Sequence, residues 1–182
     1  METLEQTYRP LLEAVSFAAR AHHGQFRKDR QTPYASHPFR VCLALRHVFG
    51  MDDPRVLTAA VLHDTIEDTT TDFDDLVAHF GPEVAGWVAL LSKDKRSQEE
   101  PREQAYRQTL AAAPWQVKVC KLGDVFDNLL DSPHTRPELR RRTLARSRSY
   151  LDVLDDPSLP PPARKAYQTV EQLLKEMETD VV

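Results

Sequence analysis

The sequence predicts an all-α fold, a single helical bundle of about seven to nine helices. Apolar residues recur at three- and four-residue spacing through most of the chain, which is typical of helices with one buried face. No segment shows the sustained alternation of β-branched residues that indicates a half-buried strand. The five glycines mostly fall between the periodic segments, where they end helices.

Glycine and proline divide the first half of the chain into its elements. In order, we predict a helix over 8–23 that Gly24 ends, a polar basic loop over 24–36, a helix from about His37-Pro38 to Gly50, a helix opened by Asp53-Pro54, a short helix that Gly81 stops, and a helix that Pro82 starts. Thr71 and Asp74 have the spacing of a capping box for the short helix. In the helix after Pro82, we expect Val84, Val88 and Leu91 to face the core, with Trp87 beside them.

The second half begins with a charged segment over 92–103 that lacks apolar residues and is predicted to be a connector. Prolines then separate four further helices, predicted over 103–112, 115–130, 137–155 and 161–178.

Length and composition restrict the class of protein. A chain of 182 residues fits one domain over 1–182, and its net charge of −4 gives no general attraction to nucleic acid or to an anionic membrane. Cys42 and Cys120 lie in apolar helical patterns and are predicted to be reduced core residues. The chain shows no signal-peptide pattern and no apolar run of about 18 residues, so we expect a cytoplasmic protein. Its oligomeric state stays open, a homo-oligomer included.

The most informative segment is 61–69, in which four ionisable side chains follow an apolar helical run: His63, Asp64, Glu67 and Asp68. Burying such a group costs several kcal/mol unless the charges are paired, and a divalent metal ion is an effective partner for several acids. His63 and Asp64 are about 100° apart on a helix, so they can share one ion only near the end of that helix.

Two further candidate ligands lie elsewhere in the chain. His37 begins one predicted helix, and Asp124 interrupts the apolar face of another. A mixed set of nitrogen and oxygen ligands suits Mn²⁺ or Fe²⁺, and sometimes Zn²⁺. The alternative is that both histidines are hydrogen-bonded core residues and that Asp124 is a salt-bridge partner.

The order His37, His63-Asp64, Asp124 resembles the HD superfamily of metal-dependent phosphohydrolases. Longer motifs resemble the hydrolase domain of RelA/SpoT-type alarmone enzymes, over about residues 10–131. These motifs are Ala21-His22-His23-Gly24-Gln25-Phe26-Arg27-Lys28, Pro33-Tyr34-Ala35-Ser36-His37-Pro38, 63–69, Phe80-Gly81 and Val119-Cys120-Lys121-Leu122-Gly123-Asp124. Only helices are predicted over residues 132–182, and the chain therefore resembles the small stand-alone alarmone hydrolases, including the animal type.

The resemblance implies an HD-type bundle that hydrolyses the 3′-pyrophosphate of (p)ppGpp or (p)ppApp with Mn²⁺. It implies that His37, His63, Asp64 and Asp124 are the metal ligands, that Glu67 and Asp68 lie beside the reacting phosphate, and that Asn128 contacts the substrate. Glu67, four residues after His63, is expected on the same helical face, where it can accept a proton from the attacking water.

An acidic protein needs a local positive field to hold a substrate with several phosphates. We expect Arg27 and Lys28, together with Lys93 and Lys95, to supply it. The arginines over 136–148 alternate with leucines, so we interpret them as a charged outer face rather than as an RNA-binding surface.

Three alternatives to an alarmone hydrolase stay open from the sequence. An HD-type phosphatase would act on NADPH or another nucleotide phosphomonoester. A non-catalytic module would bind nucleotides without turnover. An RNA-binding protein would depend on the 136–148 arginines.

The chain departs from the family pattern at four places. Gln31-Thr32 replaces a glycine and an acid before Pro-Tyr, which puts the shape of that loop in question, and Gly123 replaces an alanine. Asp127 and Leu130 stand where the family often has an aromatic or histidine residue and an arginine. We expect an extra acid and a missing base near the nucleotide to affect which substrate is accepted.

Overall fold

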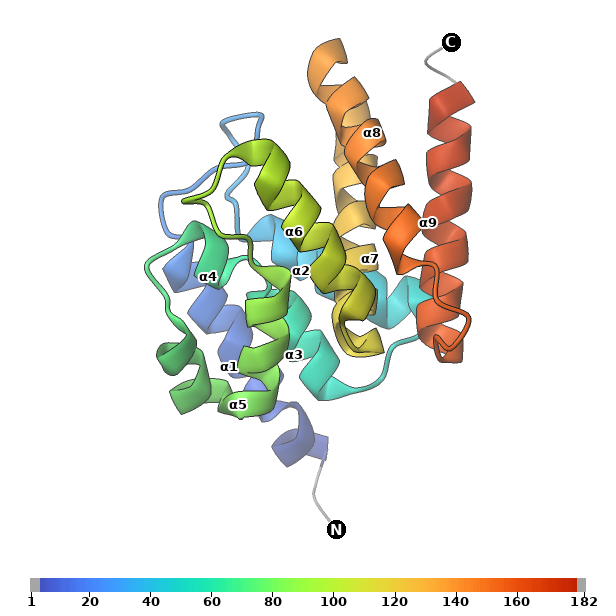
Figure 1. Ribbon diagram of the computed structural model, residues 1–182. Helices are drawn as coiled ribbons and strands as arrows, with labels where there is room; N and C mark the ends of the chain where they lie inside the picture. The colour runs from blue at the N-terminus through green and yellow to red at the C-terminus, as the bar shows by residue number, and fades with distance from the viewer. Residues whose placement is uncertain (1–3, 180–182) are drawn as a thin grey trace.

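The computed structural model describes residues 4–179, which form helices α1 to α9 with two shorter helical turns, η1 and η2 (Figure 1). The bounds are α1 Leu4–Ala21, α2 Ser36–Leu43, η1 Ala44–Phe49, α3 Pro54–Leu62, α4 Thr65–Asp68, α5 Phe73–Leu91, α6 Glu99–Ala112, α7 Trp115–Asp131, η2 Ser132–His134, α8 Pro137–Leu154 and α9 Pro161–Thr179. Within this range the β structure consists of an isolated bridge between Phe26 and Pro33. The all-α prediction is confirmed.

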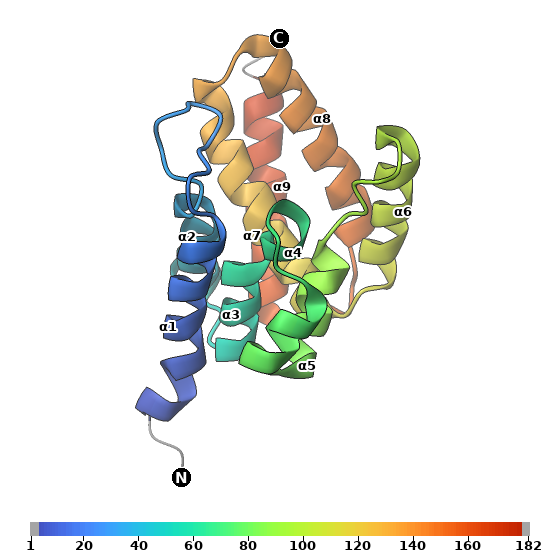
Figure 2. The same cartoon turned by 90° about the vertical axis from the view of Figure 1, so that its left-hand side faces the viewer.

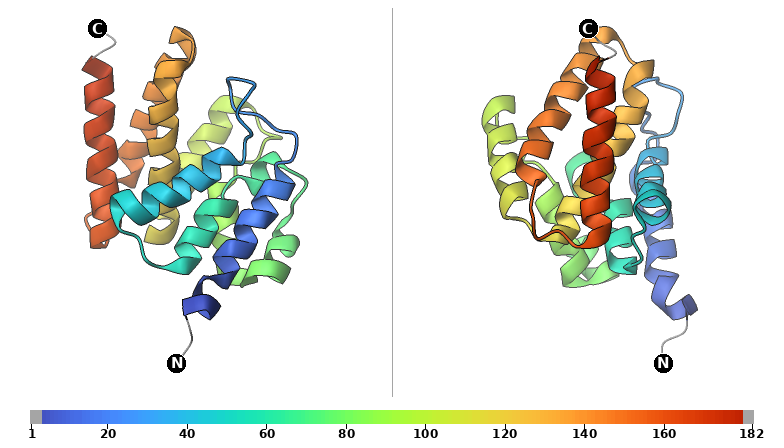
Figure 3. Two further views of the ribbon diagram at one scale, coloured as in Figure 1. Left: turned by 180° about the vertical axis from the view of Figure 1, so that it is seen from behind. Right: turned by 90° about the vertical axis from the view of Figure 1, so that its right-hand side faces the viewer.

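Helix α7 is the centre of the bundle. It contacts α2, α3, α5, α8 and α9. Figure 2 shows α7 between α2 on one side and α8 on the other. Its residues are almost continuously buried from Val117 to Val125. The view from behind shows α9 lying along α7, and α1 and α3 packed together on the opposite side of the bundle from α9 (Figure 3). Polar side chains on α7 are therefore held inside the bundle.

Most helix boundaries follow the local signals that the sequence carries. Asp53 caps α3 by accepting a hydrogen bond from the backbone N–H of Arg55 at 2.9 Å. Gly50 ends η1 with a left-handed φ of 81°. Gly81, with a φ of 81°, breaks α5 into two helical parts, so the expected stop and restart at 81–82 are confirmed.

Two boundary predictions were wrong. The capping box lies one residue later than expected, because Asp72 and Asp75, not Thr71 and Asp74, exchange the two hydrogen bonds. The segment 92–103 is not all connector, since α6 already begins at Glu99. Acidic residues in a first turn are favoured by the helix dipole, a contribution that needs no apolar pattern.

Over residues 4–179, none of the helices has both the length and the apolar character needed to cross a bilayer.

Candidate active site

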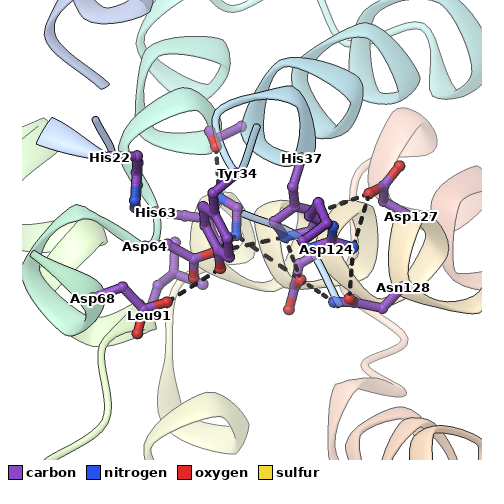
Figure 4. Close-up of polar contacts among 12 residues, drawn as sticks. His22, Tyr34, His37, His63, Asp64, Asp68, Leu91, Asp124, Asp127 and Asn128 are labelled. Carbon is purple, nitrogen blue, oxygen red and sulfur yellow. Dashed lines mark hydrogen bonds and ion pairs between the residues drawn. The ribbon is translucent and has the colours of Figure 1, made fainter. Parts of the chain in front are cut away.

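Four side chains predicted as metal ligands meet near the middle of the bundle (Figure 4). Nε2 of His37 lies 3.1 Å from Oδ1 of Asp124 and 3.6 Å from Oδ2 of Asp64. Nε2 of His63 lies 3.1 Å from the same Asp64 oxygen and 3.9 Å from Oδ1 of Asp124. One atom from each of His37, His63 and Asp124 falls within 4.8 Å of the others. Two nitrogens and two carboxylates therefore face one point.

The end of α3 allows two adjacent residues to reach this point. The helix stops at Leu62, and His63 and Asp64 form the turn before the single turn of α4. Two neighbouring residues can share one ion when they lie at the end of a helix, as His63 and Asp64 do here. The turn also separates His63 from Glu67, which lies on α4, so the expectation that they share one helical face was wrong.

Hydrogen bonds leave Nε2 of both histidines directed at the cluster. Nδ1 of His63 lies 2.7 Å from the backbone oxygen of Ala60, and Nδ1 of His37 lies 2.7 Å from Oδ2 of Asp127. Nε2 of His63 is buried, and its approach to Oδ2 of Asp64 at 3.1 Å does not have the geometry of a hydrogen bond. A buried ring nitrogen without a well-formed hydrogen bond is costly, and a metal ion facing it would remove that cost. The donor set therefore fits a divalent ion.

The electrostatics of the cluster show strong coupling between acids and bases. Burial alone would lower the pKa of His63, but Asp64 raises that pKa to about 9. Burial opposes ionisation of Asp64 and Asp124 as well, yet the facing cations hold the pKa of both carboxyls below its usual range. Lys121 is the first of these cations for Asp124.

Lys121 was assigned no role from the sequence, although it lies in the last of the motifs. Its Nζ lies 2.7 Å from Oδ2 of Asp124 and 4.3 Å from the centre of the Tyr150 ring. It is buried on α7, and it also lies 5.2 Å from the ring centre of Tyr106. Lysine on an apolar helix usually extends its ammonium group to solvent, so the sequence pattern alone does not predict that Lys121 is buried.

Tyr34 was also not assigned a role from the sequence, although it lies in one of the motifs. Its hydroxyl lies 2.6 Å from Oδ2 of Asp64 and 3.1 Å from Oδ2 of Asp68. Burial and the neighbouring Asp64 raise the pKa of Tyr34, so the phenol stays protonated. Tyr34 therefore connects a predicted ligand to a predicted catalytic acid.

Glu67 and Asp68 lie at the edge of the same hollow. Oε2 of Glu67 accepts a hydrogen bond from the backbone N–H of Lys93 at 3.0 Å. Burial raises the pKa of Glu67 above its usual value, although Lys93 acts in the opposite direction. Asp68 forms a close ion pair with Lys95. A carboxylate with a raised pKa is suited to accept a proton near neutral pH.

The predicted cationic residues are distributed around the hollow. Arg27, Lys28 and Lys93 line it, and Nζ of Lys93 also lies 2.9 Å from Oε1 of Glu103. Lys95 is not among its lining residues and reaches the site only through Asp68. Asn128 lines it and donates a hydrogen bond to Oδ1 of Asp124 at 2.5 Å.

The loop that carries Arg27 keeps a closed shape without the glycine and acid of the family pattern. Oδ1 of Asp29 accepts hydrogen bonds from the backbone N–H groups of Gln31 and Thr32 at 2.8 and 2.9 Å. The Thr32 hydroxyl donates to Oδ2 of Asp29 at 2.6 Å. Arg30 has a left-handed φ of 60°. Hydrogen bonds to the Asp29 side chain thus hold the turn at Gln31-Thr32, where the family has a glycine and an acid.

The expectation that Asp127 adds a negative charge beside the nucleotide was wrong. Its side chain is 3% exposed, points to His37 and Arg40, and does not line the hollow. Leu130 is 41% exposed and does not line the hollow either.

The interpretation of the 136–148 arginines as an outer face was wrong in part. Arg142 and Arg146, one turn apart on α8, line the same hollow as the predicted metal ligands. Arg146 also donates a hydrogen bond to Oε1 of Glu99 on α6 at 2.7 Å. Helix α8 therefore forms one wall of the site. The hollow has a volume of about 340 Å³, enough for much of a nucleotide.

Comparison with known proteins agrees with this geometry. The model of the HD domain family matches residues 14–151. Two curated relatives, from Xenopus tropicalis and Homo sapiens, are guanosine-3′,5′-bis(diphosphate) 3′-pyrophosphohydrolases named MESH1. They are 40% and 41% identical over 129 residues, which is 70% of this chain and 72% of each relative. A solved structure described as a metazoan orthologue of SpoT that hydrolyses ppGpp superposes with a TM-score of 0.80 at 28% identity, covering 92% of this chain and 94% of that one.

Proposed function

Because the chain belongs to the HD domain family, we propose that it is a metal-dependent hydrolase that removes the 3′-pyrophosphate of guanosine 3′,5′-bis(diphosphate). The main support is that His37, His63, Asp64 and Asp124 converge in a hollow that is bordered by cationic side chains. Relatives that share most of this chain are named for that reaction. A nucleotide with several phosphates is the substrate class that such a hollow suits.

Mn²⁺ is the ion we propose for the cluster. Imidazole nitrogens and carboxylate oxygens together suit Mn²⁺, which prefers harder ligands than a thiolate site offers. When bound, such an ion supplies Lewis acidity and lowers the pKa of a coordinated water toward neutrality.

The residues of this chain then have separable tasks. We propose that Glu67 takes a proton from the attacking water, since its pKa is raised and it borders the hollow. Asp68 orients that water and is itself held by Tyr34 and Lys95. The water oxygen attacks the phosphorus that is bonded to the ribose 3′ oxygen. The bond between this phosphorus and the 3′ oxygen breaks, the 3′ oxygen takes up a proton, and pyrophosphate leaves.

The cations of the hollow would bind the phosphates. Lys121 and Lys93 approach it from α7 and the 92–98 connector, Arg27 and Lys28 from the loop, and Arg142 and Arg146 from α8. Charge-assisted hydrogen bonds from several directions restrain a flexible pyrophosphate. Asn128, which already contacts Asp124 and Arg27, is proposed as a further substrate contact.

Product analysis tests the proposal most directly. The purified protein is incubated with Mn²⁺ and, in parallel, with ppGpp, ppApp and NADPH, beside an Asp64→Ala variant. Pyrophosphate from ppGpp, absent with the variant, is the expected result, and the ppApp arm measures the base preference. Orthophosphate from NADPH alone would replace the proposal with a phosphatase. Tight nucleotide binding without any product would make the protein a binding module.

We propose a small-molecule nucleotide as the partner, with neither nucleic acid nor a membrane, and a cytoplasmic location. The organisation of 1–182 as one domain and the oligomeric state stay predictions.

A further inference from the structure

The imidazole of His37 is held from both sides. On one side, Nε2 faces Asp124 and Asp64 at 3.1 and 3.6 Å. On the other, Nδ1 lies 2.7 Å from Oδ2 of Asp127, which Figure 4 shows on the side of the ring away from His63. The side chains of His37 and Asp127 are 2% and 3% exposed, so water does not compete for this contact.

The two histidines of the cluster differ in this respect. Nδ1 of His63 lies against a neutral backbone oxygen, that of Ala60, whereas Nδ1 of His37 lies against a carboxylate. A carboxylate at that position fixes the ring tautomer and makes the opposite nitrogen a better electron donor to a metal. His37 is therefore the histidine whose donor strength depends on another side chain.

Asp127 is itself held firmly by its surroundings. It follows Asp124 by three residues on α7, so both acids project toward α2 from neighbouring turns. Its other oxygen, Oδ1, lies 2.7 Å from Nε of Arg40, and Nη2 of Arg27 is 3.7 Å from Oδ2. Because the other neighbours of Asp127 are N–H donors, the carboxylate acts as an acceptor and the shared proton belongs on Nδ1 of His37.

We propose that Asp127 is a positioning residue that fixes His37 with its Nε2 lone pair directed at the metal and thereby sets the affinity for the ion. The inference rests on the proposed metal centre. Asp127 does not line the hollow, so its effect on the reaction passes through His37 and not through the substrate.

The chain offers a matched control at Asp131. This carboxylate binds the same two arginines, with Oδ2 2.7 Å from Arg27 and Oδ1 2.8 Å from Arg40. It lies one turn beyond Asp127 on α7, and its ion pairs are with the two arginines and not with His37. Replacing Asp131 disturbs the same guanidinium groups while leaving the histidine contact in place.

The test measures Mn²⁺ affinity by calorimetry on metal-free protein for the wild type, Asp127→Asn, Asp131→Asn and Asp64→Ala. We expect Asp127→Asn to bind Mn²⁺ about 10- to 100-fold more weakly, the usual effect of losing such a partner, and Asp131→Asn to stay within about threefold of the wild type. At saturating Mn²⁺, Asp127→Asn should recover most of its kcat and keep its KM, because Asp127 does not line the hollow and Arg27 keeps its closer ion pair with Asp131 at 2.7 Å. Thermal unfolding of each metal-free variant separates this effect from a loss of stability.

Two outcomes overturn the inference: wild-type Mn²⁺ affinity in Asp127→Asn, or an equal loss in Asp127→Asn and Asp131→Asn. If Asp127→Asn does not fold, Arg40→Gln decides. The Arg40 side chain is 43% exposed, and losing its donor to Oδ1 of Asp127 should weaken Mn²⁺ binding by more than the threefold margin allowed for Asp131→Asn, whereas an affinity within that margin counts against the inference. Failure of the wild type itself to bind Mn²⁺ would instead refute the proposed metal centre.

Discussion

Gly123 sets the distance between the two helices that carry His37 and Asp124. A Cβ atom added at Gly123 would lie 3.0 Å from Cγ1 of Val41 and 3.2 Å from Cδ2 of Leu45. Both neighbours are fully buried, on α2 and η1. Both distances are shorter than ordinary van der Waals contact, so Gly123→Ala should push α2 and α7 apart by a few tenths of an ångström.

Two opposing effects determine the magnitude. Alanine stabilises a helix interior by about 0.5–1 kcal/mol relative to glycine. Overpacking a buried contact costs about 1–3 kcal/mol. The sum for Gly123→Ala is a change in the free energy of unfolding between about zero and −2.5 kcal/mol. Gly86 on α5 is the matched control, because its added Cβ would meet nothing within 4 Å. Gly86→Ala should therefore gain the full 0.5–1 kcal/mol.

Urea denaturation of both variants, followed by circular dichroism, gives the comparison. Val41→Ala should lower the free energy of unfolding by less in the Gly123→Ala background than in the wild type, since it removes the methyl group that the new Cβ atom crowds. Because α2 carries His37, Gly123→Ala should also weaken Mn²⁺ binding, whereas Gly86→Ala should not. Equal stabilisation by both alanines, with unchanged metal binding, would show that α2 and α7 tolerate the methyl group and would refute the reasoning.

Three further predictions concern polar groups of the site. Glu67→Gln should lower kcat by about 10²- to 10⁴-fold in steady-state assays while Mn²⁺ binding stays near the wild-type value, because the amide cannot accept the proton. Since burial raises the pKa of Glu67 above 4.5, wild-type kcat should fall as the pH drops through that raised pKa, and a limb at or below 4.5 would argue against Glu67 as the base. Tyr34→Phe removes the hydrogen bond of 2.6 Å to Asp64 and should reduce the free energy of unfolding by about 1.5–3 kcal/mol in urea titrations, whereas an unchanged value would mean that this contact is not formed in solution. Lys121→Met breaks a buried pair and should destabilise the metal-free protein by about 3–5 kcal/mol. Saturating Mn²⁺ should restore more stability to Lys121→Met than to the wild type, and equal restoration would contradict a counterion role for Lys121.

The sequence predicts the helices well where local signals act within a few residues. Gly50, Asp53 and Gly81 mark boundaries because their own backbone or side-chain geometry creates them. The capping box was placed wrongly because the pairs 71/74 and 72/75 both have a four-residue capping spacing, and only the fold selects one. The start of α6 at Glu99 was missed because that turn carries no apolar residue.

The candidate site was predictable only where its residue types are unusual for their surroundings. An acid on the buried face of α7 draws attention to Asp124. The same argument applies to Asp127 and Lys121, yet a family pattern directed the interpretation of Asp127 toward the substrate, and lysine is ordinarily assumed to be solvated. Which face of α8 meets the hollow depends on how α8 packs on α7, and periodicity within α8 does not contain that information.

Burial of acids is by itself weak evidence for a metal ion, because Lys121 already balances one of them. Asp124 has a cation at 2.7 Å, and Asp64 has the hydroxyl of Tyr34 and two facing histidines. The bundle can therefore fold around this cluster with protein groups alone. The stronger evidence is the buried Nε2 of His63, which lies 3.1 Å from Asp64 and 3.9 Å from Asp124 but forms a hydrogen bond of good geometry with neither. A site that directs this nitrogen at two carboxylates without a hydrogen bond is organised for a ligand that binds nitrogen and oxygen together.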